Sequence, residues 1–205
     1  MKKTTVVLAI LLTVLMSGCA PRPLPDVPVY IEERVKAPTS VEEAYNRAWY
    51  LWKEDSKTET TSGAVIHLPY RISGRIIGRV SITLQKINKE YRLINIVVGG
   101  VDCRTKRGCY RGEYHANFDF GNAIDKNAGA LTRGESQKVG HEIWFITDEQ
   151  IKIMSIHGAD LSLKYNHYNS FMRDFPGSGY MEIQVPAVYV QGFLKKVNEL
   201  HNKTK

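Results

Sequence analysis

The most chemically distinctive residues of this chain are two cysteines that enclose a basic loop. Cys103 and Cys109 are separated by five residues, and the segment 104–111 contains four cations, which are Arg104, Lys106, Arg107 and Arg111. A disulfide would hold this loop rigid, and a preorganised cationic loop loses less entropy when it binds phosphate or carboxylate groups. We therefore expect an anion-binding or protein-binding tip here. A stapled, solvated hairpin without a binding role is the alternative.

Residues that could form a catalytic or metal centre do not converge along the chain. His157, Asp160 and His167 come closest to a metal-ligand set, but their spacing matches no known zinc pattern. The segment Pro176-Gly177-Ser178-Gly179 does not match the G-x-S-x-G pattern of a serine nucleophile. The sequence therefore predicts no catalytic residue, no metal ligand and no cofactor.

The amino-terminal segment combines a positive start, an apolar run and a cysteine. Lys2 and Lys3 precede the apolar run 6–15, and Met16-Ser17-Gly18-Cys19 follows it. This segment resembles a bacterial lipoprotein signal peptide with its lipobox. The resemblance implies that residues 1–18 are removed, that lipid is attached to Cys19, and that the new amino group is acylated. A secretory signal cleaved elsewhere would instead leave Cys19 as an ordinary thiol.

The expected compartment follows from the same segment. Ala20 follows the cysteine, whereas an Asp at that position tends to retain Gram-negative lipoproteins in the inner membrane. We therefore expect a lipid anchor in the outer membrane, on its periplasmic face. This oxidising compartment favours a disulfide between Cys103 and Cys109 over free thiols or metal binding.

The charge of the chain gives a weaker indication of its partners. The formal net charge is +7, and loss of Lys2 and Lys3 with the signal would lower it by two. A mildly basic protein suits an anionic partner, although ordinary surface lysines that aid solubility explain the charge equally well. Nucleic acid is not expected as a partner in the periplasm.

A proline-rich segment follows the signal. Residues 19–39 contain five prolines, at positions 21, 23, 25, 28 and 38. Prolines favour polyproline II and disfavour helices and central strands, so this segment is expected to be an extended tether. At about 3.1 Å per residue it would reach on the order of 60 Å. A single domain over residues 40–205 is expected to follow.

Two helices are predicted, one near each end of the domain. Ser40 and Glu43 match a capping box. Apolar residues then recur at helical spacing, at Val41, Ala44, Tyr45, Ala48, Leu51 and Trp52. Tyr45, Trp49 and Trp52 are accordingly expected in the core, and a binding stripe formed by these three aromatic residues is the alternative. Pro186 suits the first turn of a closing helix whose apolar stripe is Val190, Phe193, Leu194, Val197 and Leu200.

Between the helices the pattern is that of strands. Apolar or alternating segments occupy 64–70, 72–85, 91–98, 110–120, 143–146, 151–156, 161–165 and 180–185. Residues 147–150 are expected to form a hairpin turn, and 121–140 a long mobile loop. The predicted fold is α+β, with an antiparallel sheet of about six to eight strands and the amino-terminal and carboxy-terminal helices packed on it.

The function expected from these features is non-catalytic. The chain is predicted to be a membrane-anchored periplasmic lipoprotein that binds another envelope component, as an assembly accessory, adaptor or inhibitor. The membrane is contacted through the lipid on Cys19, and the partner is expected to be an envelope protein or an anionic envelope glycolipid. A lipid or small-ligand carrier, or an envelope enzyme whose site forms only in three dimensions, is the alternative.

Overall fold

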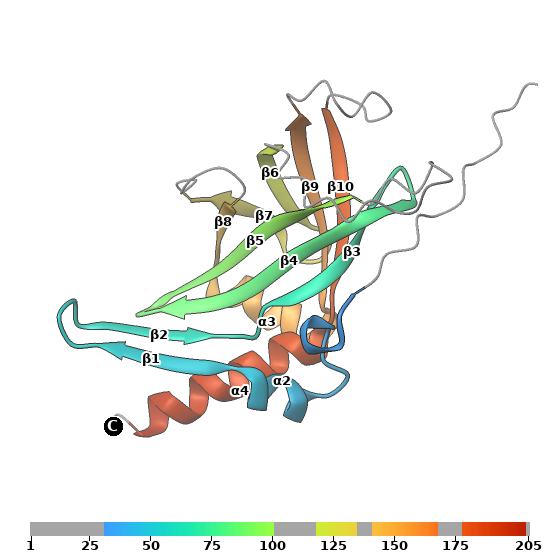
Figure 1. Cartoon of the computed structure of the whole chain (residues 1–205). Helices are drawn as coiled ribbons and strands as arrows, with labels where there is room; N and C mark the ends of the chain where they lie inside the picture. Colours follow the sequence, from blue (N-terminus) through green and yellow to red (C-terminus); the bar gives the residue numbers. More distant parts are fainter. Residues whose placement is uncertain (1–30, 101–117, 135–140, 168–177, 204–205) are drawn as a thin grey trace, which may run out of the picture.

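The computed structural model describes residues 31–100, 118–134, 141–167 and 178–203. These form one sheet of ten strands, with the order β1-β2-β4-β3-β10-β9-β6-β7-β8-β5. Because β4 also pairs with β5, eight of the strands close into a barrel, and the hairpin β1–β2 is attached outside it (Figure 1). The α+β class and the antiparallel pairing are thus confirmed, but the sheet has ten strands rather than six to eight.

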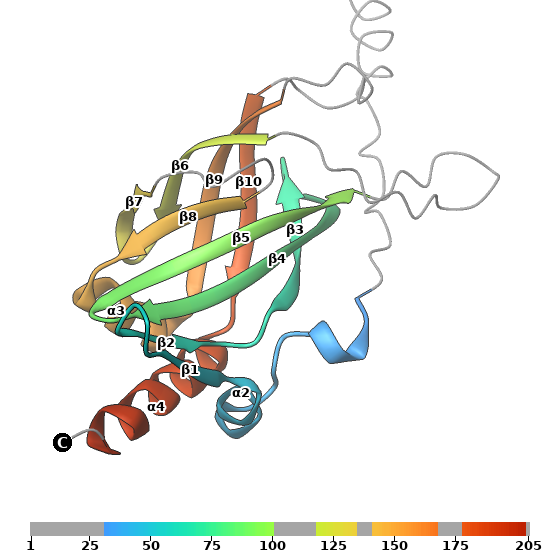
Figure 2. The same cartoon turned by 60° about the vertical axis from the view of Figure 1, so that its left-hand side comes forward.

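The strands are β1 (Trp49–Lys53), β2 (Thr58–Ser62), β3 (Ile66–Ile72), β4 (Arg75–Ile87), β5 (Glu90–Gly100), β6 (Phe118–Asp125), β7 (Gly129–Arg133), β8 (His141–Ile146), β9 (Ala159–His167) and β10 (Ser178–Val185). The helical elements are the short 3-10 helix η1 (Glu33–Val35) and the α-helices α2 (Val41–Arg47), α3 (Asp148–His157) and α4 (Ala187–Lys203). Helices α3 and α4 lie at one end of the barrel (Figures 1 and 2).

The interior of the barrel is filled by large side chains. Alternate residues of each strand point inward, as Val80, Ile82 and Leu84 do on β4. The bulkiest fully buried side chains are Tyr70, Phe120, Trp144 and Tyr165 from the strands and Tyr189 and Phe193 from α4. An eight-stranded barrel is just wide enough for side chains to fill it, so α4 completes the core from one end.

One buried hydroxyl joins α4 to the point where the hairpin meets the barrel. Tyr189 donates a hydrogen bond to the carbonyl oxygen of Ala64 at 2.6 Å and accepts one from the backbone N–H of Leu84 at 3.1 Å. A Cβ added at Gly63 would lie 2.7 Å from this hydroxyl, so only glycine fits beside it. The link between β2 and β3 is therefore shaped around the Tyr189 ring.

The first helix packs on α4 by a close backbone approach. A Cβ added at Gly192 would lie 2.3 Å from the Cβ of Ala44 and 2.6 Å from the carbonyl oxygen of Val41. Two polar contacts flank this crossing: the Tyr45 hydroxyl donates to Glu199, and Lys195 is paired with Glu42. The prediction that this helix packs on the sheet is therefore wrong in its partner, because α2 packs mainly against α4.

The chain that precedes α2 is also held to the domain. The Arg47 guanidinium donates to the carbonyl oxygens of Lys36 at 2.9 Å and Arg34 at 3.1 Å. Ala37 packs against the core. Residues 34–37, at the end of the predicted tether, thus contact the folded domain, and residues 1–30 lie outside the described part.

The first predicted helix is too long. The Ser40 hydroxyl caps α2 as expected, but the helix ends at Arg47 because Ala48 adopts an extended conformation. Residues 49–53 form β1, so Trp49 and Trp52 do not belong to the core and are about half exposed. Pairing with β2 overrides the helical spacing of the apolar residues.

A second segment was predicted as a strand and is a helix. Residues 151–156 lie in α3, because Thr147 and Gln150 form a capping box in which each side chain bonds the backbone of the other residue. The predicted hairpin turn at 147–150 is therefore the helix start.

The predicted loop at 121–140 is largely a hairpin. Residues 121–125 belong to β6 and 129–133 to β7. The Asp125 carboxylate accepts from the backbone N–H groups of Asn127 at 2.8 Å and Ala128 at 2.5 Å, and Gly129 has a φ of +82°. These contacts form a tight turn, so the polar residues serve a hairpin and not a long loop. Residues 135–140 lie outside the described part.

The close crossing of the helices gives a first prediction. Gly192→Ala should destabilise the protein by about 1–3 kcal/mol, because the added methyl group has to push α2 away from α4. For a chain of this size the melting temperature should fall by roughly 2–12 °C, measured by circular dichroism. Gly121→Ala is the control, since its Cβ would meet nothing within 4 Å. Equal melting temperatures for the two variants would contradict this crossing.

Candidate functional site

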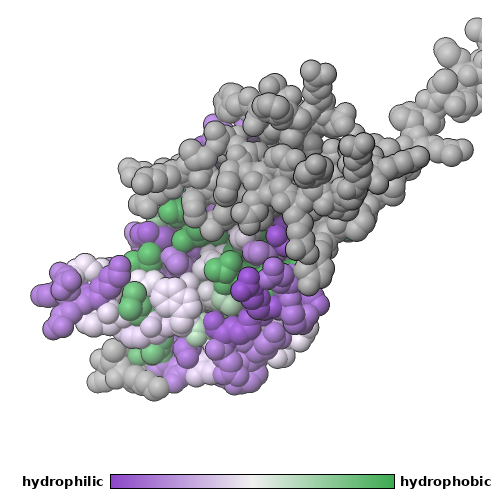
Figure 3. All heavy atoms as spheres, in the orientation of Figure 1, coloured by the Kyte–Doolittle hydropathy of each residue, from purple (hydrophilic) through white to green (hydrophobic). Residues whose placement is uncertain are grey.

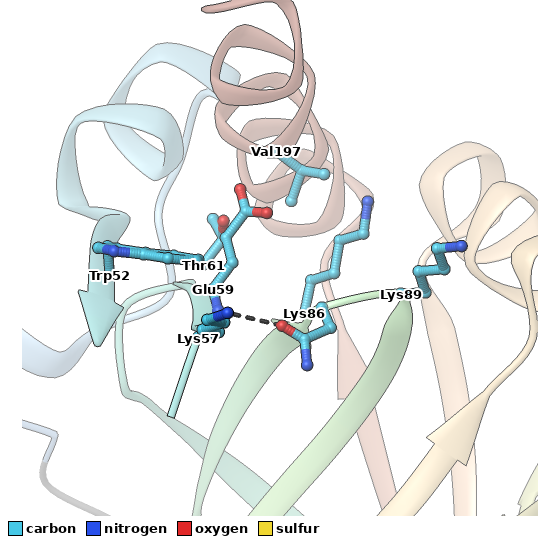
Figure 4. A pocket seen from close by; sticks show the side chains of 8 residues that line it. Trp52, Lys57, Glu59, Thr61, Lys86, Lys89 and Val197 are labelled. Carbon is cyan, nitrogen blue, oxygen red and sulfur yellow. Dashed lines mark hydrogen bonds between the residues drawn. The ribbon is translucent and has the colours of Figure 1, made fainter. Parts of the chain in front are cut away.

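An open cleft of about 340 Å³ lies between the β1–β2 hairpin, the end of β4 and α4 (Figure 4). We call it the hairpin cleft. Its lining residues come from four parts of the chain, namely the hairpin (Trp52, Lys57, Glu59 and Thr61), β4 (Lys86), the turn after β4 (Asn88 and Lys89) and α4 (Val197). Hairpin, strand, turn and helix thus meet at one surface hollow.

Backbone pairing sets the position of the hairpin. Strand β2 pairs with β4 only over Thr60–Ser62, opposite residues 85–87, so the rest of the hairpin projects beyond the barrel. Asn88, with a φ of +54°, fixes the projecting part. Its N–H donates to the carbonyl oxygen of Glu59 at 2.8 Å, and its side-chain oxygen accepts from the Glu59 N–H at 3.0 Å. The floor of the cleft is therefore rigid.

Three lysines make the cleft basic. Lys57 lies in the hairpin turn, Lys86 near the end of β4, and Lys89 in the turn before β5. None of the salt bridges found among the described residues involves them. The Lys86 ammonium lies 5.2 Å from the centroid of the Tyr91 ring. Glu59 is the single acidic side chain among the described residues that line the cleft, and it extends toward α4 (Figure 4).

Aromatic surface gathers on the same hairpin. Trp49, Leu51 and Trp52 are 46%, 40% and 51% exposed, and they are three of the seven large hydrophobic residues found exposed in the described chain. In Figure 3 the hairpin tip projects as a hydrophilic lobe, and the surface next to it is near white. Exposed indole next to unpaired lysine suits recognition of a group that is partly apolar and partly anionic.

The site residues predicted from the sequence fall outside the described residues. These are the lipidation site Cys19, the disulfide pair Cys103 and Cys109, and the basic loop residues Arg104, Lys106, Arg107 and Arg111. All of them remain predictions.

Metal-ligand residues do not gather among the described residues. His157 ends α3 and is exposed. In the described ranges, no three His, Cys, Asp or Glu side chains gather in a group that could hold a metal ion. None of the described helices is long and apolar enough to cross a membrane.

A second polar cluster joins β6, β7 and β8, with Glu142 buried and Arg133 and Asp119 partly exposed. The Arg133 guanidinium binds both carboxylate oxygens of Glu142 at 3.1 Å and the Asp119 carboxylate at 3.0 Å. Burial raises the pKa of Glu142 and outweighs the opposing effect of Arg133. Asn95 lies opposite Glu142 on β5 and is fully buried. Because Arg133 neutralises the buried carboxylate and joins β6, β7 and β8, we interpret this cluster as structural.

Sequence reasoning missed the cleft because it assigned Trp52 to the core. One signal could have located the hairpin. Residues 54–57 are polar turn formers, and the Thr-rich segment 58–62 that follows them has high β propensity. A strand at 58–62 requires a partner, and residues 49–53 are the nearest candidate along the chain.

The exposure of the hairpin can be tested by fluorescence, because the chain has three tryptophans. Trp49 and Trp52 are about half exposed, whereas Trp144 is fully buried. In a Trp49→Phe, Trp52→Phe double variant, acrylamide should quench the remaining emission severalfold less than in the wild type, and the emission should shift to shorter wavelength. Equal quenching of the two proteins would mean that the hairpin is not exposed as described.

Comparisons of this chain with protein-family models, curated proteins and solved structures gave no match. The role of the hairpin cleft therefore has to be inferred from its own chemistry. That chemistry consists of one exposed indole, three lysines without a carboxylate partner among the described residues, and a rigid strand floor.

Proposed function

We propose that this protein is a non-catalytic, lipid-anchored lipoprotein of the bacterial envelope that binds another envelope component through the hairpin cleft. The observation that carries the proposal is the set of lysines, Lys57, Lys86 and Lys89, around an open hollow beside Trp52. Three cations that form no salt bridge with another described residue attract an anionic group and speed its encounter with the surface. The partner is thus an acidic envelope protein or an anionic envelope glycolipid.

The filled barrel favours a binding surface over a ligand carrier. A carrier requires an apolar cavity, but aromatic side chains from the strands and from α4 occupy the interior of the described barrel. The open hollow among the described residues lies outside the barrel wall, where a large partner has access to it. A surface site of this kind suits an adaptor, an assembly accessory or an inhibitor.

Photo-crosslinking in living cells tests the cleft. A photoreactive amino acid at Lys57 should give a discrete adduct with an acidic protein or a glycolipid, identified by mass spectrometry. The same probe at Ile156, which is 69% exposed on α3, should give none.

Charge reversal shows whether the adduct depends on the cleft. Lys86→Glu with Lys89→Glu should reduce the Lys57 adduct roughly tenfold, because two favourable charge contacts become repulsive. Lys126→Glu with Lys152→Glu changes the net charge equally at exposed sites elsewhere and should leave the adduct unchanged. Equal effects of the two double variants would argue against the cleft.

The anchor is tested separately. Cells that express the wild-type chain should incorporate labelled palmitate into the protein, and Cys19→Ser should abolish the label. The reason is that the lipobox cysteine supplies the sulfur to which the lipid is attached. Label retained on Cys19→Ser would exclude this cysteine as the lipid site.

A further inference from the structure

Strand β1 is an open edge. Every other strand of the described sheet has at least two strand neighbours, whereas β1 pairs with β2 alone. An edge strand directs alternate backbone N–H and C=O groups away from its neighbour, and these groups can pair with a further strand. The described contacts include no backbone hydrogen bond to this outer edge.

The side chains of β1 do little to protect the edge. Proteins guard open edges with lysine, proline, bulges or very short strands. Strand β1 has five residues in unbroken register with β2, no proline, and a single lysine at its end. Its exposed side chains are mainly large and apolar. Such an edge is open to pairing with a further strand.

The sequence of β1 is complementary to itself. When a second copy of residues 49–53 runs antiparallel with Leu51 opposite Leu51, Trp49 faces Lys53 and Tyr50 faces Trp52. The first pair places a cation beside an indole, the second joins two aromatic rings, and the central pair joins two leucines. Each of these kinds of cross-strand pair is stabilising. The two Lys53 side chains lie at opposite ends of the paired strands, about 14 Å apart, so their repulsion is screened.

We propose that two copies of this chain pair through β1 in an antiparallel arrangement centred on Leu51. The contact is isologous, as in most homodimers, because each copy contributes the same surface. It joins the two hairpins into one continuous sheet and pairs the open backbone edge of β1, while the side chains of β1 still point to the two faces of that sheet. Since directly opposed residues point to the same face, both hairpin clefts open on one side of the dimer. This inference is independent of what the cleft binds.

Cysteine cross-linking tests the register in intact cells. Leu51→Cys places two thiols opposite each other on the two-fold axis, so an added oxidant should convert most of the protein into a disulfide-linked dimer. Thr60→Cys is the matched control: Thr60 pairs with Leu51 on β2, so its thiols lie one strand further from the axis on each side. Thr60→Cys and the wild-type chain should show only background dimer. Equal cross-linking of Leu51→Cys and Thr60→Cys would overturn the proposal.

Charge at the axis provides the second test. Leu51→Lys places two like charges directly opposite each other and should weaken dimerisation at least tenfold. Val65→Lys introduces the same charge at a site that is 46% exposed outside β1 and should leave dimerisation unchanged. The measurement is the sedimentation of the full-length chain in detergent over a range of concentrations. A wild-type chain that stays monomeric at every concentration would refute the pairing.

Discussion

The hydroxyl of Tyr189 fixes the place where the hairpin ends and the barrel begins. It bonds the carbonyl of Ala64 on one side and the N–H of Leu84 on the other, in a fully buried position. Either backbone group left unpaired there would cost about 1–3 kcal/mol. Burial raises the pKa of Tyr189, so the phenol keeps its proton at neutral pH and can donate and accept at once. Gly63 leaves room for the ring, and the chain turns from β2 into β3 around it.

The shape of the surface follows from this anchor. With Tyr189 and Phe193 inserted into the barrel, α4 lies across one end, and Val197 faces the hairpin cleft. Gly192 on the same helix lets α2 approach closely, and α2 leads into β1. The hairpin is thus held between α4 and the Asn88 turn, which bonds its second strand. The cleft depends on core packing although it lies outside the core.

The parts of the fold that could be read from the sequence are those whose local signals agree with their tertiary setting. Ser40 caps a helix, Val80 to Leu84 alternates along a strand, and Pro186 precedes the closing helix. For residues 41–53 the prediction failed because local and tertiary signals disagree. The apolar spacing of 41–52 fits one helix, yet pairing with 58–62 draws residues 49–53 into a strand. Barrel closure was not predictable either, because it depends on β4 pairing with β5 and on a chain of pairs that runs from β3 through β10 to β8. The cleft was missed because the helical spacing of 41–52 assigned Trp52 to the core.

The residues that stabilise this molecule lie mainly in the closed barrel, whereas the hairpin strand β1 lies outside it. Each of the eight barrel strands pairs with a strand on both sides, and together they bury the large side chains. Strand β1 contributes no buried side chain. Substitutions on β1 should therefore change the surface at small cost to the folded state, whereas most inward positions of the barrel do not tolerate change. An element with this freedom and an open edge has the physical properties of an interaction surface, and three exposed apolar side chains lie on it, beside the lysines of the hairpin cleft.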